Sequence, residues 1–139
     1  LLFDGTLRLS GDNLLGQLGL GLTEFVCIPC TMPLNDINII ACGATHTLIV
    51  TNSGDIYGFG SNRSGCLGIG NREKQFRPVK LEFEGTVKSI CCGRDYTLIL
   101  NDDGMLWGFG KNGYSYCLGL PQKVDRLIPE KLHSGVVLV

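Results

Sequence analysis

Short apolar segments bounded by turn residues run along most of this chain. They are four to eight residues long and rich in Val, Ile, Leu, Thr and aromatic residues, and Gly, Asn, Asp or Ser stands at their ends. This pattern predicts β-strands. In the middle of the chain it places strands near residues 37–42, 46–51, 55–60 and 77–83. Because no window keeps the i, i+3, i+4, i+7 spacing long enough for a ten-residue helix, the chain is predicted to be all-β.

Two of the predicted connections are hairpin turns. Asn52-Ser53-Gly54 separates the second and third strands, and Asn101-Asp102-Asp103-Gly104 stands at the corresponding place further along the chain. Glycine after Asn, Asp or Ser tolerates the positive φ that a tight hairpin requires. The strands are therefore expected to pair as antiparallel neighbours.

Similar sequence segments recur about fifty residues later in the chain. Residues 43–50 reappear as 93–100 and residues 54–62 as 104–112, both at an offset of 50, and an earlier copy at 13–21 matches 62–70 at an offset of 49. Residues 66–68 return at an offset of 51, so one residue is inserted around 114–116. Such a period indicates a solenoid, propeller or array. Four antiparallel strands in about fifty residues make one blade of a β-propeller, and repeat surfaces mostly bind other molecules.

The repeat resembles the regulator of chromosome condensation (RCC1-like) family. The positions that carry the resemblance are Gly43-x-x-His46-Thr47, Gly54-x-Ile56-Tyr57-x-Phe59-Gly60-x-Asn62, Gly65-Cys66-Leu67-Gly68-x-Gly70 and Asn13-x-x-Gly16-Gln17-Leu18-Gly19-Leu20-Gly21. Tyr96 replaces the family's His in the third copy, and Phe59 and Phe109 stand where the family prefers Trp. These are core changes compatible with the fold. The resemblance implies a seven-bladed β-propeller.

A chain of 139 residues holds only part of such a ring. We expect a blade remnant over 1–34, blades over 35–84 and 85–133, and the start of the next blade over 134–139. That is a partial β-propeller of about 2.75 four-stranded blades, whereas propellers close with four to eight. The remaining blades are expected from the same chain or from another chain.

Seven cysteines raise the question of a metal site. Cys27, Cys30, Cys42 and His46 have a spacing that resembles zinc ligation. However, Cys42 and His46 correspond to Cys92 and Tyr96 in the next copy, inside an apolar strand pair, so we predict no metal. Cys66 and Cys117 occupy one repeat position and are predicted to be small core residues. An odd number of cysteines favours reduced thiols and an intracellular, cytoplasmic or nuclear location.

The sequence predicts neither an enzyme nor a cofactor. Residues 108–113 spell G-x-G-x-x-G, but a nucleotide fingerprint must open a helix, and no helical pattern follows. The chain has two histidines, of which His46 is expected to bond inside its own blade and His133 to be solvated. No catalytic constellation is visible. A net charge of −1 gives no overall attraction to nucleic acid or an anionic membrane, and no apolar run is long enough to span a membrane.

Function is expected where the copies differ, because loops on a rigid scaffold carry recognition. Residues 71–76 and 113–127 vary most and are expected on one side of the propeller. The predicted binding residues are charged or aromatic, and Tyr and Arg are frequent at binding hot spots. They are Arg72, Glu73, Lys74, Phe76, Tyr114, Tyr116, Lys123 and Arg126.

The predicted function is a non-enzymatic protein–protein interaction platform within a larger protein. The resemblance implies an alternative, guanine-nucleotide exchange on a Ran-like small GTPase. The expected partner is another protein, such as a small GTPase or a chromatin component, and not a membrane.

Overall fold

The computed structural model describes residues 1–114 and 116–134. These residues form strands and loops without a helix, and therefore none long and apolar enough to cross a membrane. The strands are β1 (Arg8–Gly11), β2 (Val26–Thr31), β3 (Ile37–Cys42), β4 (His46–Thr51), β5 (Ile56–Gly60), β6 (Gln75–Leu81), β7 (Val87–Cys92), β8 (Tyr96–Asn101), β9 (Met105–Gly110) and β10 (Arg126–Ser134).

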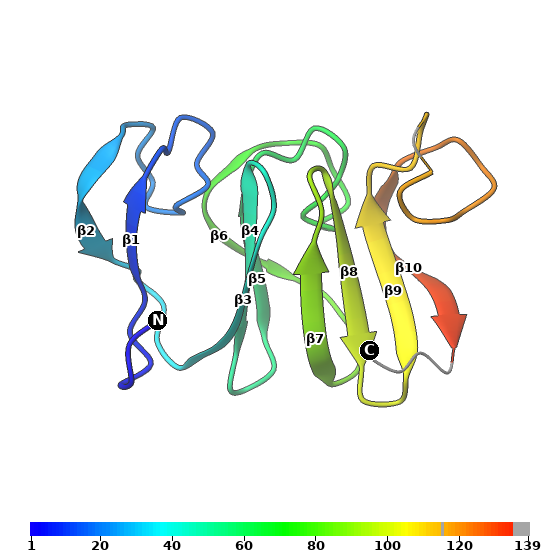
Figure 1. Ribbon diagram of the computed structural model, residues 1–139, viewed down its shortest axis with the longest axis horizontal. Coiled ribbons are helices and arrows are strands. Elements are labelled where there is room, and N and C mark those ends of the chain that lie inside the picture. Colours follow the sequence, from blue (N-terminus) through cyan, green and yellow to red (C-terminus); the bar gives the residue numbers. More distant parts are fainter. Residues whose placement is uncertain (115, 135–139) are drawn as a thin grey trace.

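The strands form three antiparallel sheets that stand side by side in an arc (Figure 1). Strands β1 and β2 form a two-stranded sheet, and β3 to β6 and β7 to β10 form two four-stranded sheets in chain order. We call the sheet of β1 and β2 the remnant blade, that of β3 to β6 the middle blade and that of β7 to β10 the third blade. The architecture confirms the predicted partial propeller. The eleventh strand, predicted at 136–139, lies outside the described residues.

Three of the four predicted strand positions in the middle blade agree closely with the structure, and the fourth is shifted. The strand predicted near 77–83 is β6, which begins at Gln75 and ends at Leu81. The shift arises because Gln75 pairs with Gly60 across an irregularity in the β5–β6 ladder. The pairing therefore continues beyond the regular apolar pattern that the sequence displays.

The middle blade buries one face against the remnant blade and the other against the third blade. In β4, Ile49 packs toward the remnant blade, whereas its neighbours Leu48 and Val50 pack toward the third blade. This alternation follows from the two-residue period of a strand. On β9, Trp107 and Phe109 share one face and pack against the middle blade, as the sequence predicted. Phe109 is fully buried, while Trp107 is only partly buried.

In the middle and third blades, a glycine lies beneath the side-chain ring of the first residue of the second strand, β4 or β8. A Cβ atom on Gly43 would lie 2.2 Å from the His46 ring, and one on Gly93 would lie 2.1 Å from the Tyr96 ring. No side chain fits in that space, so the spacing Gly-x-x-His or Gly-x-x-Tyr is a packing requirement. The same contact explains why the ring at this position can change from His to Tyr.

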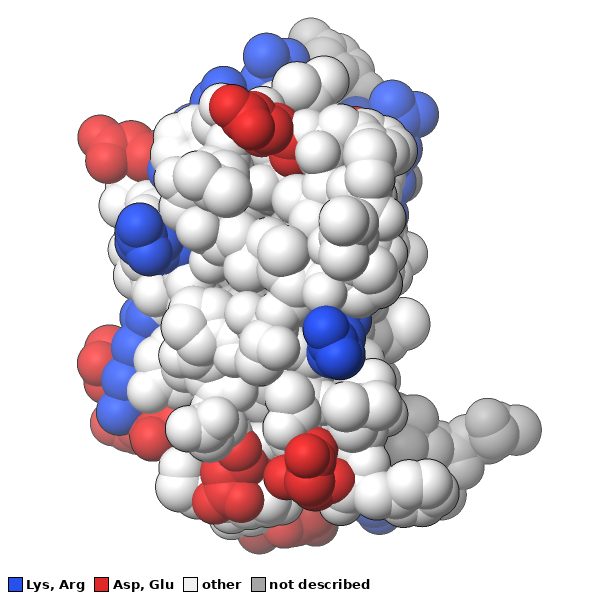
Figure 2. Space-filling model, turned by 90° about the vertical axis from the view of Figure 1, so that its left-hand side faces the viewer, with Lys and Arg blue, Asp and Glu red and all other residues white. Residues whose placement is uncertain are grey.

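The end of the arc at the remnant blade is largely uncharged (Figure 2). Phe25 and Ile28, just before and within β2, are more than half exposed. Strands β1 and β2 pair with each other alone among the described strands. A four-stranded blade would bury such residues against further strands.

Candidate functional site

Three equivalent loops join β1 to β2, β5 to β6 and β9 to β10. Each of them is built around a buried asparagine. The Asn62 side-chain oxygen accepts a hydrogen bond from the Leu67 N–H at 3.0 Å, and its amide nitrogen donates to the Asn71 carbonyl at 2.9 Å. Asn13 and Asn112 make the equivalent bonds in the other two loops. All three are fully buried. Because buried polar groups require partners, these asparagines fix the loops to the ends of the sheets.

Two of these loops lock onto the outer strand of the following blade. The Gly21 N–H donates to the Phe76 carbonyl at 2.7 Å, and the Gly70 N–H donates to the Leu127 carbonyl at 2.8 Å. At Gly65 a Cβ atom would lie 3.0 Å from the Leu127 Cα, so the two backbones approach closely. We call this pair of features, the donated N–H and the close glycine, the inter-blade latch.

The third loop has lost both parts of the latch. Its hydrogen bonds align it with the middle loop and place Tyr116 where the latter has Gly65, and Pro121 where it has Gly70. Proline has no N–H to donate. Tyr116 has a φ of 46°, in the left-handed region that disfavours a side chain. The third loop therefore departs from the structural role of its two counterparts.

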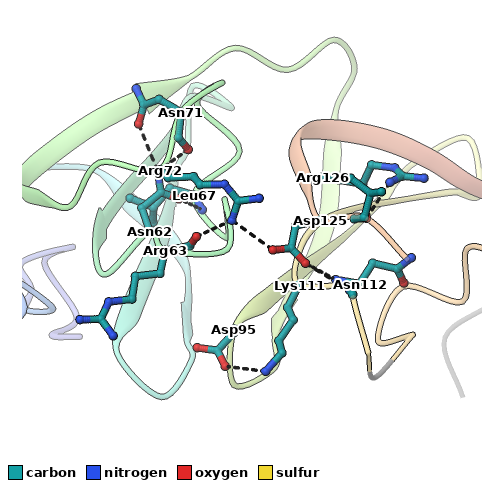
Figure 3. Close-up of polar contacts among 12 residues, drawn as sticks. Asn62, Arg63, Leu67, Asn71, Arg72, Asp95, Lys111, Asn112, Asp125 and Arg126 are labelled. Carbon is teal, nitrogen blue, oxygen red and sulfur yellow. Dashed lines mark hydrogen bonds and ion pairs between the residues drawn. The ribbon is translucent and has the colours of Figure 1, made fainter. Parts of the chain in front are cut away.

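An ion pair joins the third loop to the middle one instead (Figure 3). The Arg72 guanidinium donates to Oδ2 of Asp125 at 3.1 Å, and Oδ1 of Asp125 accepts from the backbone N–H groups of Asn112 and Gly113 at 3.0 and 3.1 Å. Partial burial opposes the charged carboxylate, but the bonds from Asn112, Arg72 and Gly113 outweigh it and lower the pKa of Asp125. The two variable loops therefore form one surface at neutral pH. We call this surface, residues 71–76 with the described part of 111–125, the rim site.

The predicted binding residues divide into two groups. Tyr114 is 94% exposed, and Tyr116 lies with Lys123 at 5.4 Å from its ring. Lys74 lies 6.0 Å from the Phe76 ring. Together with exposed Glu73, these side chains remain available to a partner. A cavity of about 320 Å³ lies beside them, with walls that include Arg72, Lys111, Tyr114 and Lys123.

The other predicted residues also support the scaffold. Arg126 contacts Glu130, the Val124 carbonyl and the Gln122 side chain, and its side chain is only 15% exposed. Arg72 holds Asp125. Phe76 and Arg126 were predicted to lie in loops, but they are strand residues at the starts of β6 and β10. The loops end where the outer strands begin to pair with β5 and β9.

His46 connects two blades, which corrects the expectation that it bonds inside its own blade. Its Nε2 lies 3.2 Å from the Thr97 hydroxyl, which itself donates to the Cys66 carbonyl at 2.8 Å. The hydroxyl therefore accepts from a protonated Nε2, and Nδ1 is buried without a hydrogen bond. Burial lowers the pKa of His46 to about 4, although nearby Asp95 works in the opposite direction. His46 is a neutral structural residue at pH 7.

The cysteines differ in exposure, and the glycine-rich segment 108–113 comprises the end of β9 and the start of the loop after it. Cys27, Cys30 and Cys42 are exposed, whereas His46 is buried. Within residues 1–114 and 116–134, no three His, Cys, Asp or Glu side chains gather as a metal site would require. Cys66 is buried, as predicted, but Cys117 is only half-buried. Gly108 and Gly110 belong to β9, and Gly113 follows in the loop without opening a helix.

Neighbouring cysteines on β7 should differ sharply in reactivity. Cys91 is exposed, whereas burial raises the pKa of the Cys92 thiol to about 12. Since the thiolate is the reactive form, we expect an alkylating reagent to label Cys91 in the folded protein and Cys92 only after denaturation. Mass spectrometry of peptides labelled before and after unfolding measures this. Equal labelling of both in the folded protein would contradict the register of β7.

Sequence profiles of one family match most of the chain. The profile described as the regulator of chromosome condensation (RCC1) repeat matches residues 4–50 and 53–100, and a second profile of the same description matches residues 37–66 and 87–115. Among curated proteins, the chain is 39% identical over 88 residues to the ultraviolet-B receptor UVR8 of Arabidopsis thaliana. It is 37% identical over 73 residues to the human X-linked retinitis pigmentosa GTPase regulator.

These matches cover a small part of much longer proteins. The first match spans 61% of this chain and 20% of UVR8, and the second spans 50% of this chain and 7% of the GTPase regulator. Among solved structures, yeast RCC1 (Prp20) bound to Kap60 is similar with a TM-score of 0.86 at 26% identity, over 96% of this chain and 34% of the other.

A second structure, of Prp20p from Saccharomyces cerevisiae, is described with its binding to Gsp1p and histones. It has a TM-score of 0.84 at 26% identity, and the match covers 96% of this chain and 35% of the other. The profile matches, the four-stranded blades and these structures agree with the resemblance seen in the repeat. The chain belongs to the RCC1 repeat family.

Proposed function

We propose that this chain is a segment of an RCC1-type propeller that acts as a non-enzymatic protein-interaction platform, with the rim site as its binding surface. One observation carries the proposal. The third loop has replaced both latch glycines with Tyr116 and Pro121, and it is joined to the middle loop through Asp125 and Arg72. Loops on a rigid scaffold carry recognition, and Pro121 cannot donate the N–H that Gly21 and Gly70 donate in the other two loops.

The side chains of the rim site favour a protein partner that presents carboxylates. Lys123 lies over the Tyr116 ring and lines one cavity with Tyr114, and Lys74 lies over the Phe76 ring. Aromatic residues beside cations are typical of binding hot spots. Tyr116 keeps its side chain at a φ that glycine adopts without strain in the other two loops. Side-chain function is one reason to retain a strained residue.

A second candidate is guanine-nucleotide exchange on a small GTPase. It is supported by the 26% identity to Prp20p, whose structure is described with its binding to Gsp1p and histones, and by the similarity to a GTPase regulator. Exchange acts through surface contacts and needs no catalytic residue of the kind found in hydrolases. On either candidate, further blades from the same or another chain complete the ring, and the protein works in the cytoplasm or nucleus.

Exposed rim residues can be tested without disturbing the loop scaffold. We expect Lys74→Ala, Tyr114→Ala and Lys123→Ala, combined in the full-length protein, to weaken recovery of a protein partner by at least about tenfold. Truncating even one hot-spot residue costs about 2 kcal/mol or more, and a tenfold loss corresponds to about 1.4 kcal/mol. Arg72, Asp125 and Arg126 stay intact, so the melting temperature should be unchanged. Affinity capture with quantitative mass spectrometry measures the effect.

The matched control lies at the opposite rim. Lys88→Ala with Asp102→Ala changes two exposed charges near the β8–β9 hairpin and should leave partner recovery unchanged. Equal loss from both variants would contradict the assignment of the rim. A GDP-release assay with Ran-type GTPases separates the two functions, because acceleration by the complete propeller supports exchange and its absence supports a platform alone.

A further inference from the structure

A second cavity lies between the middle and third blades, at their outer strands. Its volume is about 520 Å³, within the range of ligand sites in proteins. Strands β3 and β4 pack against β7, whereas no Cα atom of β6 comes within 8 Å of one in β10. The blades therefore diverge outward and leave a wedge between them. Its walls are mostly apolar and include Ile69, Val79, Phe83, Trp107, Ile128 and Pro129.

Trp107 forms part of one wall of this wedge. The indole N–H of Trp107 is buried and has no hydrogen-bond partner among the described residues. The ring is held by Phe83, which meets it edge to face at a centroid distance of 5.6 Å. The Trp107 ring therefore forms a fixed and largely apolar part of the cavity wall.

The mouth of the wedge is negatively charged. Glu82 and Glu84 are exposed and belong to the cavity lining, as does Lys80. The Lys80 ammonium is already paired with Asp55 at 2.9 Å. Two carboxylates thus remain to attract a cation beside an apolar cavity.

We propose that the wedge binds an extended segment of a partner protein in which a large apolar side chain is flanked by Lys or Arg. The apolar side chain fills the cavity beside Trp107, and the basic side chains face Glu82 and Glu84. Strand β6 is the edge of its sheet, so its outer backbone groups can also pair with an extended segment. The wedge shares Asn71 and Gln75 with the rim site but includes neither Tyr114 nor Lys123, so the variants below test the wedge alone.

Trp107 is the only tryptophan of these 139 residues. In the full-length protein, the fluorescence that is lost in Trp107→Phe is the signal that reports on the cavity. The probe is the amidated, acetylated peptide Lys-Leu-Phe-Leu-Lys, and the matched probe is Glu-Leu-Phe-Leu-Glu. We expect the basic peptide to shift the emission saturably and to bind at least about tenfold more tightly, a difference of 1.4 kcal/mol. No saturable shift at millimolar peptide, or equal affinity for the two peptides, overturns the proposal.

Exposed residues allow variants that keep the fold. Glu82→Lys with Glu84→Lys should reverse the preference between the two peptides, and Ile128→Arg should weaken both by obstructing the cavity. Glu24→Lys, which changes an exposed carboxylate on the β1–β2 connection, should leave both affinities unchanged. If Glu24→Lys matches the double variant, the effect is one of overall charge and the site is refuted.

Discussion

Phe109→Ala is expected to lower the free energy of unfolding by about 3–5 kcal/mol, as large aromatic truncations in cores do. Phe109 has no exposed surface and lies in the core between the middle and third blades, with Leu81 of the middle blade in the same cluster. It also fills the space above Gly68, where a Cβ atom would lie 2.9 Å from its ring. Urea denaturation followed by circular dichroism measures the loss.

An exposed phenylalanine in the same chain provides the control. Phe3 is 114% exposed relative to a reference residue, so Phe3→Ala should change the free energy of unfolding by less than about 0.5 kcal/mol. A loss below about 1 kcal/mol for Phe109→Ala would mean that the blades do not share this core.

Acidification should destabilise the protein through His46. Burial lowers the pKa of this imidazole from 6.5 to about 4, so the folded protein resists the proton that the unfolded chain accepts. The stabilising contribution is therefore complete above pH 6.5 and is lost as the pH falls from 6.5 to about 4. At the lower end the loss is roughly 3 kcal/mol, because each pKa unit corresponds to 1.36 kcal/mol. Denaturation curves recorded across this pH range measure it.

A glutamine variant isolates the effect. In His46→Gln the amide can still donate to Thr97 but does not titrate, so the slope of stability between pH 6.5 and 4 should be smaller than in the parent protein. Were His46→Gln to follow the parent curve across this range, the titration would have to come from another group.

The strands were predictable because successive blades of a propeller repeat the same pattern of apolar residues. The alternation of Leu48, Ile49 and Val50, and the return of the same pattern at residues 98–100, reflect faces that must be buried on both sides. The start of β6 was not predictable, since polar Gln75 lies outside the apolar pattern and pairs with Gly60 across an irregularity in the ladder. The partner of His46 was missed for a related reason: Thr97 is 51 residues away and belongs to the next blade.

The candidate site was predictable in outline but not in its internal roles. Variation between the copies indicated residues 71–76 and 113–127 as the candidate site. These two segments do meet, through the ion pair of Arg72 and Asp125. The sequence alone could not show that Arg72 and Arg126 support the loops, since an arginine in a contact and one in solvent look the same. Pro121 and Tyr116 become informative only once the hydrogen bonds of Gly70 define what the position does.

The claim that the rim site binds a protein can be tested most directly by placing a photo-reactive phenylalanine analogue at Tyr114 in the full-length protein. Tyr114 is almost fully exposed, so the substitution should leave the fold intact. The predicted result is a covalent adduct with a defined protein partner that disappears when Lys74→Ala and Lys123→Ala are added, and that does not form from the same analogue at Asp102. Identical adducts from both positions, or adducts indifferent to the two lysines, would contradict it.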